Sequence, residues 1–288
     1  MPDVWDFCGF TGDPMSHNPL GRQTDYVSSY APELLFPIAR SDSRQLLSLG
    51  SSLPFRGVDL WTGYELSWLD SRGKPQVAVA EFVLPCDSEF MVESKSFKLY
   101  LNSFNQTHIA DTTQLRAMLA RDLSAVIGKP VEVHLYTVGD HLSALGKIHA
   151  CDGVCLDGLP VAIDTYHPQP DYLGCQVSAG VVDESVYSHL LKTNCPVTGQ
   201  PDWASVQIRY RGKAISHEGL LRYIVSFREH QDFHEHCVER IFMDIWQRCA
   251  PESLTVYARY TRRGGLDINP LRTSEHRWSL ESKRLLRQ

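Results

Sequence analysis

The chain has 288 residues, of which 43% are hydrophobic and 22% charged, a composition that excludes a disordered or fibrous protein and suits one large domain or two modest ones. Its 28 basic residues against 34 acidic ones give a formal net charge of −6, which disfavours direct binding to nucleic acid or to an anionic membrane. No apolar run approaches the roughly 20 residues of a membrane-spanning helix, and no signal peptide is recognisable. We therefore expect a cytoplasmic protein whose eight cysteines are reduced thiols.

The first half of the chain predicts an arm followed by strands and then helices. Residues 1–50 are rich in Pro, Ser, Gly and Asp without a sustained period, which indicates an arm of turns. Two strands are expected over 57–69 and 74–84, joined by a hairpin turn. Apolar spacings of three and four then predict a helix around 97–104 and a longer one from Asp111 or Thr112 to a stop at Gly128-Lys-Pro130. A further strand follows over 131–138.

The second half repeats this order. A strand is expected over 204–210, a helical stripe over 220–227, a helix with apolar residues from Val238 to Trp246, and a strand over 254–260. The two helical stripes align Tyr100 with Tyr223, Ser103 with Ser226 and Phe104 with Phe227, each at an offset of 123.

Such a long period indicates two similar domains rather than a repeat array. The order of elements predicts an α+β fold, with an antiparallel sheet and paired helices on one face of each copy. We place the copies at 1–150, including the arm 1–50, and at 151–288, with 139–170 as the link.

Common cofactor motifs are missing from the sequence. No Gly-rich dinucleotide or nucleoside triphosphate loop is present. His234, Glu235, His236 and Cys237 are residue types that bind zinc, but on a helix His234 and His236 lie about 200° apart. We therefore expect no metal site.

Cys195 opens a loop that ends at Asp202. Pro196, Gly199 and Pro201 predict a tight turn that presents the thiol, and the Asp202 carboxylate is close enough in sequence to move a proton for a nucleophilic sulfur. The alternative is a structural thiol in a turn. The segment alone favours that alternative, because a cysteine without an adjacent histidine is a weak signal.

Glu93 stands at the predicted start of the helix around 97–104, where the helix dipole favours a carboxylate. Lys95 and Lys98 follow one turn apart and are suited to a phosphate, although a solvated helix face is the commoner use of such a pattern. His234 and Glu235 open the corresponding helix of the second half, where a simple polar first turn is again the alternative.

Three segments together, Glu93–Tyr100, Cys195–Asp202 and Phe233–Glu235, resemble the NADPH-dependent 7-cyano-7-deazaguanine reductases, the nitrile reductases of queuosine biosynthesis. The resemblance covers nearly the whole chain in the two-module form of that family, and no motif position departs from it. It implies two tandem tunnelling-fold modules that reduce the nitrile of a small deazapurine to 7-aminomethyl-7-deazaguanine with two NADPH.

The resemblance also implies roles for particular residues. Cys195 would form a covalent thioimide with the nitrile carbon, Asp202 would supply the proton, and His234 would relay one. The implied substrate-binding residues are Glu93, Ser94, Phe233, His234 and Glu235. The implied NADPH-binding residues are Ser94, Lys95, Arg263 and Gly264.

Assembly is implied by resemblance as well. Only the first half has the Glu-Ser-Lys motif and only the second has the cysteine loop, so one site needs both modules. The family closes its barrels by association, which implies a homodimer or higher oligomer. Aromatic residues expected where the modules meet are Tyr210, Phe227, Tyr257 and Tyr260. Two other hypotheses are a zinc-dependent, pterin-forming cyclohydrolase on the same fold and a purine-binding module without catalysis.

Overall fold

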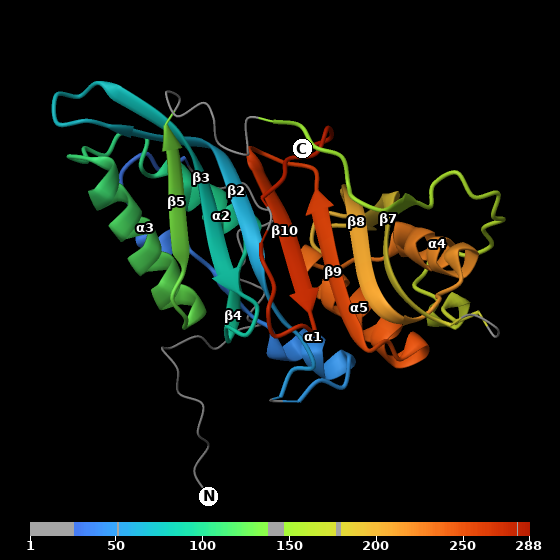
Figure 1. The fold of residues 1–288 in the computed structure, drawn as a ribbon. Coiled ribbons are helices and arrows are strands. Elements are labelled where there is room, and N and C mark those ends of the chain that lie inside the picture. Colours follow the sequence, from blue (N-terminus) through green and yellow to red (C-terminus); the bar gives the residue numbers. More distant parts are fainter. Residues whose placement is uncertain (1–25, 51, 138–146, 177–179, 281) are drawn as a thin grey trace, which may run out of the picture.

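The computed structural model describes residues 26–50, 52–137, 147–176, 180–280 and 282–288. Within these ranges the protein is α+β: one eight-stranded sheet carries its main helices on one face, and a two-stranded sheet lies beside it (Figure 1). No helix in the described ranges is both long and apolar enough to cross a membrane.

The first half follows the predicted order closely. Strands β2 (Arg56–Leu69) and β3 (Pro75–Pro85) form an antiparallel hairpin, and β5 (Glu132–Thr137) pairs with β3. The helices between them are α2 (Ser94–Asn102) and α3 (Thr112–Ile127). Asp111 caps α3 by accepting a hydrogen bond from the Gln114 N–H, and Gly128 ends it at φ +76°, which confirms the start and stop predicted there.

The second half repeats the succession of two strands, helices and a strand, and adds one further strand after it. Its strands are β7 (Val181–Asn194), β8 (Pro201–Lys213), β9 (Ser253–Tyr260) and β10 (Leu266–Thr273). Its helices are α4 (His217–Val225), the 3-10 turn η5 (Ser226–Glu229) and α5 (His234–Cys249). Ahead of them stand β6 (Val154–Cys155) and the 3-10 turn η4 (Pro170–Tyr172).

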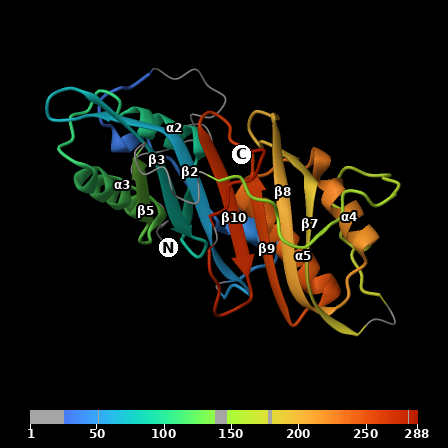
Figure 2. The same ribbon diagram turned by 45° about the horizontal axis from the view of Figure 1, so that its top comes forward.

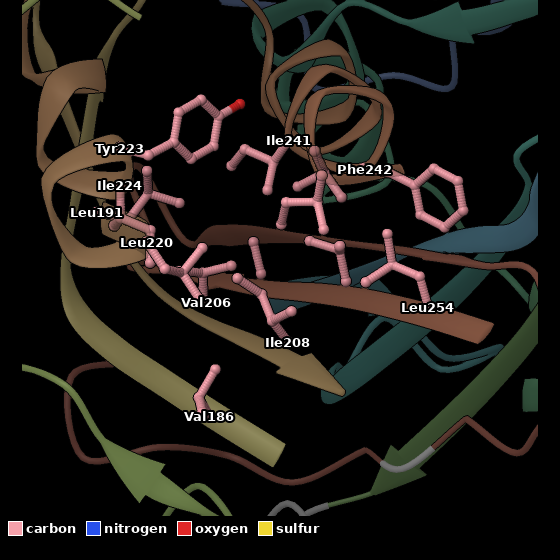
Figure 3. Packing of buried hydrophobic residues seen from close by; sticks show 14 of the residues in the cluster. Val186, Leu191, Val206, Ile208, Leu220, Tyr223, Ile224, Ile241, Phe242 and Leu254 are labelled. Atoms are coloured by element: carbon pink, nitrogen blue, oxygen red, sulfur yellow. The ribbon is translucent and has the colours of Figure 1, made fainter. Parts of the chain in front are cut away.

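The two halves join inside the sheet. Its strand order is β5-β3-β2-β10-β9-β8-β7-β6, so β10 of the second half lies antiparallel beside β2 of the first. Figures 1 and 2 show α2, α3, α4 and α5 behind this continuous sheet. Each half has its own apolar core between helices and strands; in the second half, Ile241 and Phe242 of α5 pack toward Val206, Ile208 and Leu254 of the sheet (Figure 3).

Equivalent contacts recur in the two halves. The Tyr100 hydroxyl donates to Asp122 over 2.7 Å, and the Tyr223 hydroxyl donates to Asp244 over 2.6 Å. In both helices a serine three residues later donates to the tyrosine carbonyl over 2.6 Å. The long hairpins also carry matching irregularities, at Gly63/Leu66 and at Ser188/Leu191. The alignment made on sequence thus pairs residues with the same local structure.

One expectation is wrong. The arm of turns holds regular structure: β1 (Pro37–Ala39) pairs with β4 (Phe90–Val92), and α1 (Ser41–Leu46) follows. Residues 1–25 and 138–146, including part of the expected link, lie outside the described residues. Within this chain the halves join through β2 and β10, and the four aromatic residues expected where modules meet lie on other elements; their contact across modules in an assembly stays a prediction. Those residues are Tyr210, Phe227, Tyr257 and Tyr260.

Candidate active site

The loop that carries Cys195 connects β7 to β8. The Cys195 N–H donates to the Gln200 carbonyl over 2.8 Å, and the Gly199 N–H donates to the Cys195 carbonyl over 3.0 Å. Gly199 has φ +67°, a conformation in which glycine is favoured. The tight turn is therefore confirmed, but Cys195 is only 3% exposed, so the turn shelters the residue rather than presenting it to solvent.

The surroundings of the Cys195 thiol favour the thiolate. Burial alone would raise its pKa, but hydrogen bonds from the Thr198 hydroxyl, the Thr198 and Val197 backbone and the Arg263 side chain outweigh burial and lower the pKa below its usual value. Because the thiolate is the nucleophilic form of cysteine, this turn activates the sulfur. Sequence reasoning missed Thr198; its place three residues after the cysteine in a tight loop was the available signal.

His234 is fixed between an aromatic ring and a carboxylate. Its imidazole stacks on Tyr260 with ring centroids 3.7 Å apart, and its Nε2 lies 3.4 Å from Oδ2 of Asp202. The other carboxylate oxygen of Asp202 lies 3.5 Å from Arg263. Asp202 is 6% exposed, so its carboxylate is held in a sheltered site between two potential proton donors.

Glu235 lies in the first turn of α5, after Phe233 at the N-cap position. Its side chain is 2% exposed. Burial raises the pKa of Glu235, and the nearby Asp59 carboxylate adds to that rise, whereas His234 and Arg40 oppose it.

One narrow pocket brings these side chains together. The second half contributes Cys195, Asp202, Phe233, His234 and Glu235 to its wall, and the first half contributes Trp61, Val92 and Ser94. A single chain thus supplies residues of both halves to one pocket. Asp232 also lines this pocket but was not predicted from the sequence. Its position directly before the Phe-His-Glu motif was the signal that could have identified it.

Glu93 lies at the start of α2, whereas the other residues predicted to bind the substrate line the pocket. Its carboxylate caps α2 by accepting the N–H groups of Lys95 (2.8 Å) and Ser96 (2.7 Å), and the residue is fully buried. Burial raises the Glu93 pKa, against the effect of these hydrogen bonds. The pocket wall includes Ser94 but not Glu93, so in this structure Glu93 shapes the helix start behind the wall.

A larger pocket of about 360 Å³ adjoins the first and shares Ser94, His234 and Arg263 with it. Lys95, Lys98 and Gly264 also line it. Gly264 has φ +64°, a conformation that favours glycine, and a Cβ there would lie 2.9 Å from the Lys98 Nζ, so a side chain would be strained and would displace the end of Lys98. Three cationic side chains around one pocket provide the chemistry that a phosphorylated cofactor requires.

Comparison with known proteins agrees with this geometry. The family model described as "Nitrile reductase, 7-cyano-7-deazaguanine-reductase N-term" matches residues 26–135, and one described as "QueF-like protein" matches 201–278. The NADPH-dependent 7-cyano-7-deazaguanine reductase of Bordetella avium is 56% identical over 261 residues, covering 91% of this chain and 94% of that protein. This chain belongs to that reductase family.

Other members of the reductase family match at similar levels. The protein of the same name from Verminephrobacter eiseniae is 53% identical over 280 residues, covering 96% of this chain and all of that protein. The one from Azoarcus is 58% identical over 261 residues, covering 90% and 91%. A solved archaeosine synthase QueF-Like structure superposes with a TM-score of 0.29 at 15% identity over 33% of this chain, too low to support an argument.

The histidines considered as zinc ligands in the sequence contact different residues in this reductase. His234 contacts Asp202 and Tyr260, while Nδ1 of His236 lies 2.6 Å from the Ser43 hydroxyl on another element. Across the described part of the chain, no group of three or more His, Cys, Asp or Glu side chains could hold a metal ion.

Proposed function

We propose that this protein reduces the nitrile of 7-cyano-7-deazaguanine to the aminomethyl group of 7-aminomethyl-7-deazaguanine with NADPH, a step of queuosine biosynthesis. The observation that carries the proposal is the shared pocket of Cys195, Asp202 and Glu235, in which a thiol of lowered pKa faces buried carboxylates. Membership of the reductase family gives the same substrate and cofactor.

Cys195 is the nucleophile in this proposal. Its sulfur adds to the nitrile carbon, one C≡N π bond breaks, and the nitrile nitrogen takes up a proton, which gives a covalent thioimide. Asp202 delivers that proton, and His234, 3.4 Å away, resupplies it. Because Cys195 is 3% exposed, water is kept from an intermediate that would otherwise hydrolyse.

Glu235 orients the deazapurine. An ionised carboxylate at the start of α5 accepts hydrogen bonds from the ring N–H and the amino group of the guanine-like base. Phe233 and Ser94 line the same pocket, where an aromatic face and a hydroxyl suit a planar polar ring. We place Glu93 behind them, where its cap fixes the backbone of Ser94 and the start of α2.

NADPH supplies one hydride for each of the two reduction steps. The adjoining pocket fits such a group, since Lys95, Lys98 and Arg263 offer positive charge and Gly264 allows close backbone approach. His234 lines both pockets and therefore lies where substrate and cofactor meet. Its imidazole can hold a proton at this boundary while Cys195 holds the substrate.

We also propose the assembly and compartment implied by the family. The repeated halves, 1–150 and 151–288, correspond to two tunnelling-fold modules, and their sheets close into a barrel in a homodimer or higher oligomer. Among the described residues β5 is an end strand of the large sheet, and an end strand is where a further strand can be added, which supports this proposal. We assign the reaction to the cytoplasm, because reduced thiols are typical of that compartment and the seven cysteines in the described residues are free. Cys8 lies outside the described residues.

Intact-mass measurement tests the chemistry directly. The purified protein is mixed with 7-cyano-7-deazaguanine without NADPH, and the mass and ultraviolet difference spectrum are recorded. We expect a mass gain equal to the nitrile, absent in Cys195→Ala. Tight binding with no adduct would instead indicate a purine-binding protein without catalysis, and loss of activity with a chelator would indicate the zinc-dependent alternative.

A further inference from the structure

Trp61 of β2 is a first-half residue in the wall of the narrow pocket that holds Cys195 and Glu235. It pairs directly with Ile268 of β10 where the two halves join in the sheet (Figure 1), and Ile268 lines the same pocket. Side chains directly opposite each other in an antiparallel pair lie on the same face of the sheet. Trp61 and Ile268 therefore form the sheet side of the pocket.

The Trp61 ring is fixed by an aromatic cluster. It packs edge to face on the Phe97 ring of α2, with centroids 5.1 Å apart and planes at 67°. Phe97 packs in the same way on Phe82 of β3, at 4.9 Å. Because such contacts favour one ring geometry, the indole nitrogen keeps a defined position beside the pocket.

The indole N–H of Trp61 is an unused hydrogen-bond donor. An indole nitrogen can donate but cannot accept, and Nε1 of Trp61 is buried without a hydrogen-bond partner among the described residues. Bulk solvent does not supply the acceptor, because the residue is only 1% exposed. A buried N–H group without a partner destabilises a protein. Such a group in a pocket wall indicates an acceptor on the ligand.

Two other side-chain donors in the pocket wall already have partners. The Ser94 hydroxyl donates to Oε1 of Glu93 over 3.4 Å. Nη1 of Arg263 donates to Gln200 over 2.9 Å, and its Nη2 lies 3.5 Å from Asp202. These groups are therefore less available to a new acceptor than the Trp61 indole.

His234 also has a buried nitrogen without a partner in the described part of the chain, its Nδ1. Its Nε2 lies 3.4 Å from Oδ2 of Asp202, and the nitrogen beside a carboxylate is the one that carries the proton of the neutral ring. Nδ1 is then an acceptor and cannot donate to a carbonyl group. Since Cys195 is the proposed nucleophile, Trp61 is the wall side chain that remains to donate to a ligand carbonyl.

We propose that Trp61 is a specificity-determining residue: its indole N–H donates a hydrogen bond to the 6-oxo group of the deazapurine, while Glu235 accepts the adjacent ring N–H and amino group. This inference rests on the proposed function, because it takes the guanine-like base as the ligand of this pocket. It assigns the first half of the chain a direct part in recognising the base.

The hydrogen-bonding pattern of the base explains why both residues are needed. A guanine-like edge presents one acceptor, the carbonyl oxygen, beside two donors, the ring N–H and the amino group. Glu235 satisfies the two donors, and Trp61 satisfies the acceptor next to them. A 6-amino base would instead place a donor against the indole N–H and a ring acceptor against the carboxylate. The site would reject such a base, because its own buried polar groups would be left unpaired.

Binding measurements on the full-length chain in a Cys195→Ala background, where no covalent bond forms, test the inference. Dissociation constants are measured for 7-cyano-7-deazaguanine and for its 6-thio analogue, which keeps the ring N–H and the amino group but presents sulfur, a weak acceptor. We expect Trp61→Phe to weaken binding of the oxo compound about tenfold and to change binding of the thio compound less than twofold. Trp68→Phe, a buried tryptophan of β2 outside the lining of this pocket, is the matched control and should leave both constants within twofold.

The indole proton of Trp61 gives an independent measurement in the Cys195→Ala protein. Its nuclear magnetic resonance signal, assigned through the contact with the Phe97 ring, should move downfield when the oxo compound binds, because a new hydrogen bond deshields the proton. Trp61 stays in place in this experiment, so it decides the question even if Trp61→Phe does not fold by circular dichroism.

The outcomes separate this inference from the proposed function. Equal losses for the two compounds in Trp61→Phe would show that Trp61 contributes by packing alone. That result, no loss at all, or an indole signal that does not move would overturn the inference and leave the proposed function intact. If the Cys195→Ala reference itself bound neither compound, the proposed function would fall and this inference with it.

Discussion

His234 and Tyr260 lie face to face, with their ring centroids 3.7 Å apart and their planes 2° from parallel. Tyr260 belongs to β9 and is fully buried, so it offers a rigid surface on which the imidazole rests. The stack leaves Nε2 of His234 directed at Asp202, 3.4 Å away. The orientation of the proposed proton relay is therefore set by a residue that does not itself line the substrate pocket.

Replacing Tyr260 by leucine should slow adduct formation between Cys195 and the nitrile by roughly tenfold. A well-positioned acid or base accelerates a reaction about 10²–10⁴-fold, and a misoriented His234 would lose part of that acceleration. Tyr260→Phe keeps the stacked ring and should stay within about threefold of the unaltered protein. The rate is followed by stopped-flow ultraviolet absorbance at neutral pH, with circular dichroism to confirm folding. Equal rates for the two variants would contradict a role for the stack.

The pH dependence of adduct formation should follow the Cys195 thiol. Burial would raise the Cys195 pKa, but its hydrogen bonds, Arg263 among them, lower it, so the rate should rise with pH and level off below the usual thiol range of about 8.5. Arg263→Gln removes one of those hydrogen bonds and should move the rise to higher pH, with the limiting rate retained. The profile is recorded without NADPH, so that cofactor binding does not contribute.

Arg262→Gln is the matched control for Arg263. Arg262 is the preceding residue, but its guanidinium lies over the Tyr64 ring and donates to the Gln288 carbonyl. Its pH profile should coincide with that of the unaltered protein. A profile for Arg263→Gln that does not move, or one that moves equally for Arg262→Gln, would show that the thiol is tuned by other groups.

The sequence was sufficient to predict those helices and strands whose capping residues and apolar pattern agree with their burial in the structure. The 111–128 helix has both a cap and a glycine stop, and the 57–84 hairpin has clear strand composition, so both were predictable. Strand β10 was missed because Asp267, Asn269 and Arg272 occupy buried positions in it, where an alternating apolar pattern was expected. Strand β7 was missed because polar residues and the irregularity at Ser188/Leu191 interrupt its alternation.

The site was predictable only through its motifs. Phe233, His234 and Glu235 lie in one segment, and the cysteine loop in another, but nothing local shows that Ser94 of the first half reaches the same pocket. That meeting depends on the pairing of β10 with β2, a long-range contact. The cap formed by Glu93 was likewise visible in sequence as a helix start, whereas its place behind the pocket wall was not.

Binding of NADPH should depend on the cations of the larger pocket. Lys95→Gln removes a positive charge at the start of α2 and should raise the KM for NADPH about tenfold while leaving adduct formation unchanged, because the adduct forms without cofactor. Steady-state kinetics at low and moderate salt check this, since a charge contact with phosphate weakens as salt rises. Lys129→Gln, an exposed lysine paired with Asp87 away from this pocket, should leave the KM unchanged.

Gly264 should tolerate no side chain without loss of cofactor binding. Its φ of +64° disfavours an L-residue, and a Cβ would crowd the Lys98 Nζ at 2.9 Å. We expect Gly264→Ala to raise the KM for NADPH at least fivefold, with nitrile binding within twofold. Gly158→Ala, where nothing lies within 4 Å of the added Cβ, provides the control. Unaltered NADPH kinetics in Gly264→Ala would place the cofactor elsewhere.

The repeated tyrosine–carboxylate pairs predict an order of stability. Tyr223→Phe removes the 2.6 Å hydrogen bond to Asp244, whose remaining ion pair among the described residues is with Arg240 at 3.8 Å. Leaving a partly buried carboxylate without its hydrogen-bond donor costs about 1–3 kcal/mol of folding free energy. Tyr100→Phe removes the equivalent bond to Asp122, but Asp122 still accepts the hydroxyl of Tyr30 over 2.7 Å and pairs with Arg121.

The free energy of unfolding, measured in urea, should therefore fall more for Tyr223→Phe than for Tyr100→Phe, with Tyr166→Phe on the surface as a reference near zero. Equal losses would mean that the Tyr30 and Arg121 contacts do not stabilise Asp122. The reverse order would contradict this argument, because both variants keep their rings and Tyr100 packs on Phe104 at 5.2 Å and 85°. The ring pair Tyr223 and Phe227 has the same geometry, so it cannot account for a difference between the halves.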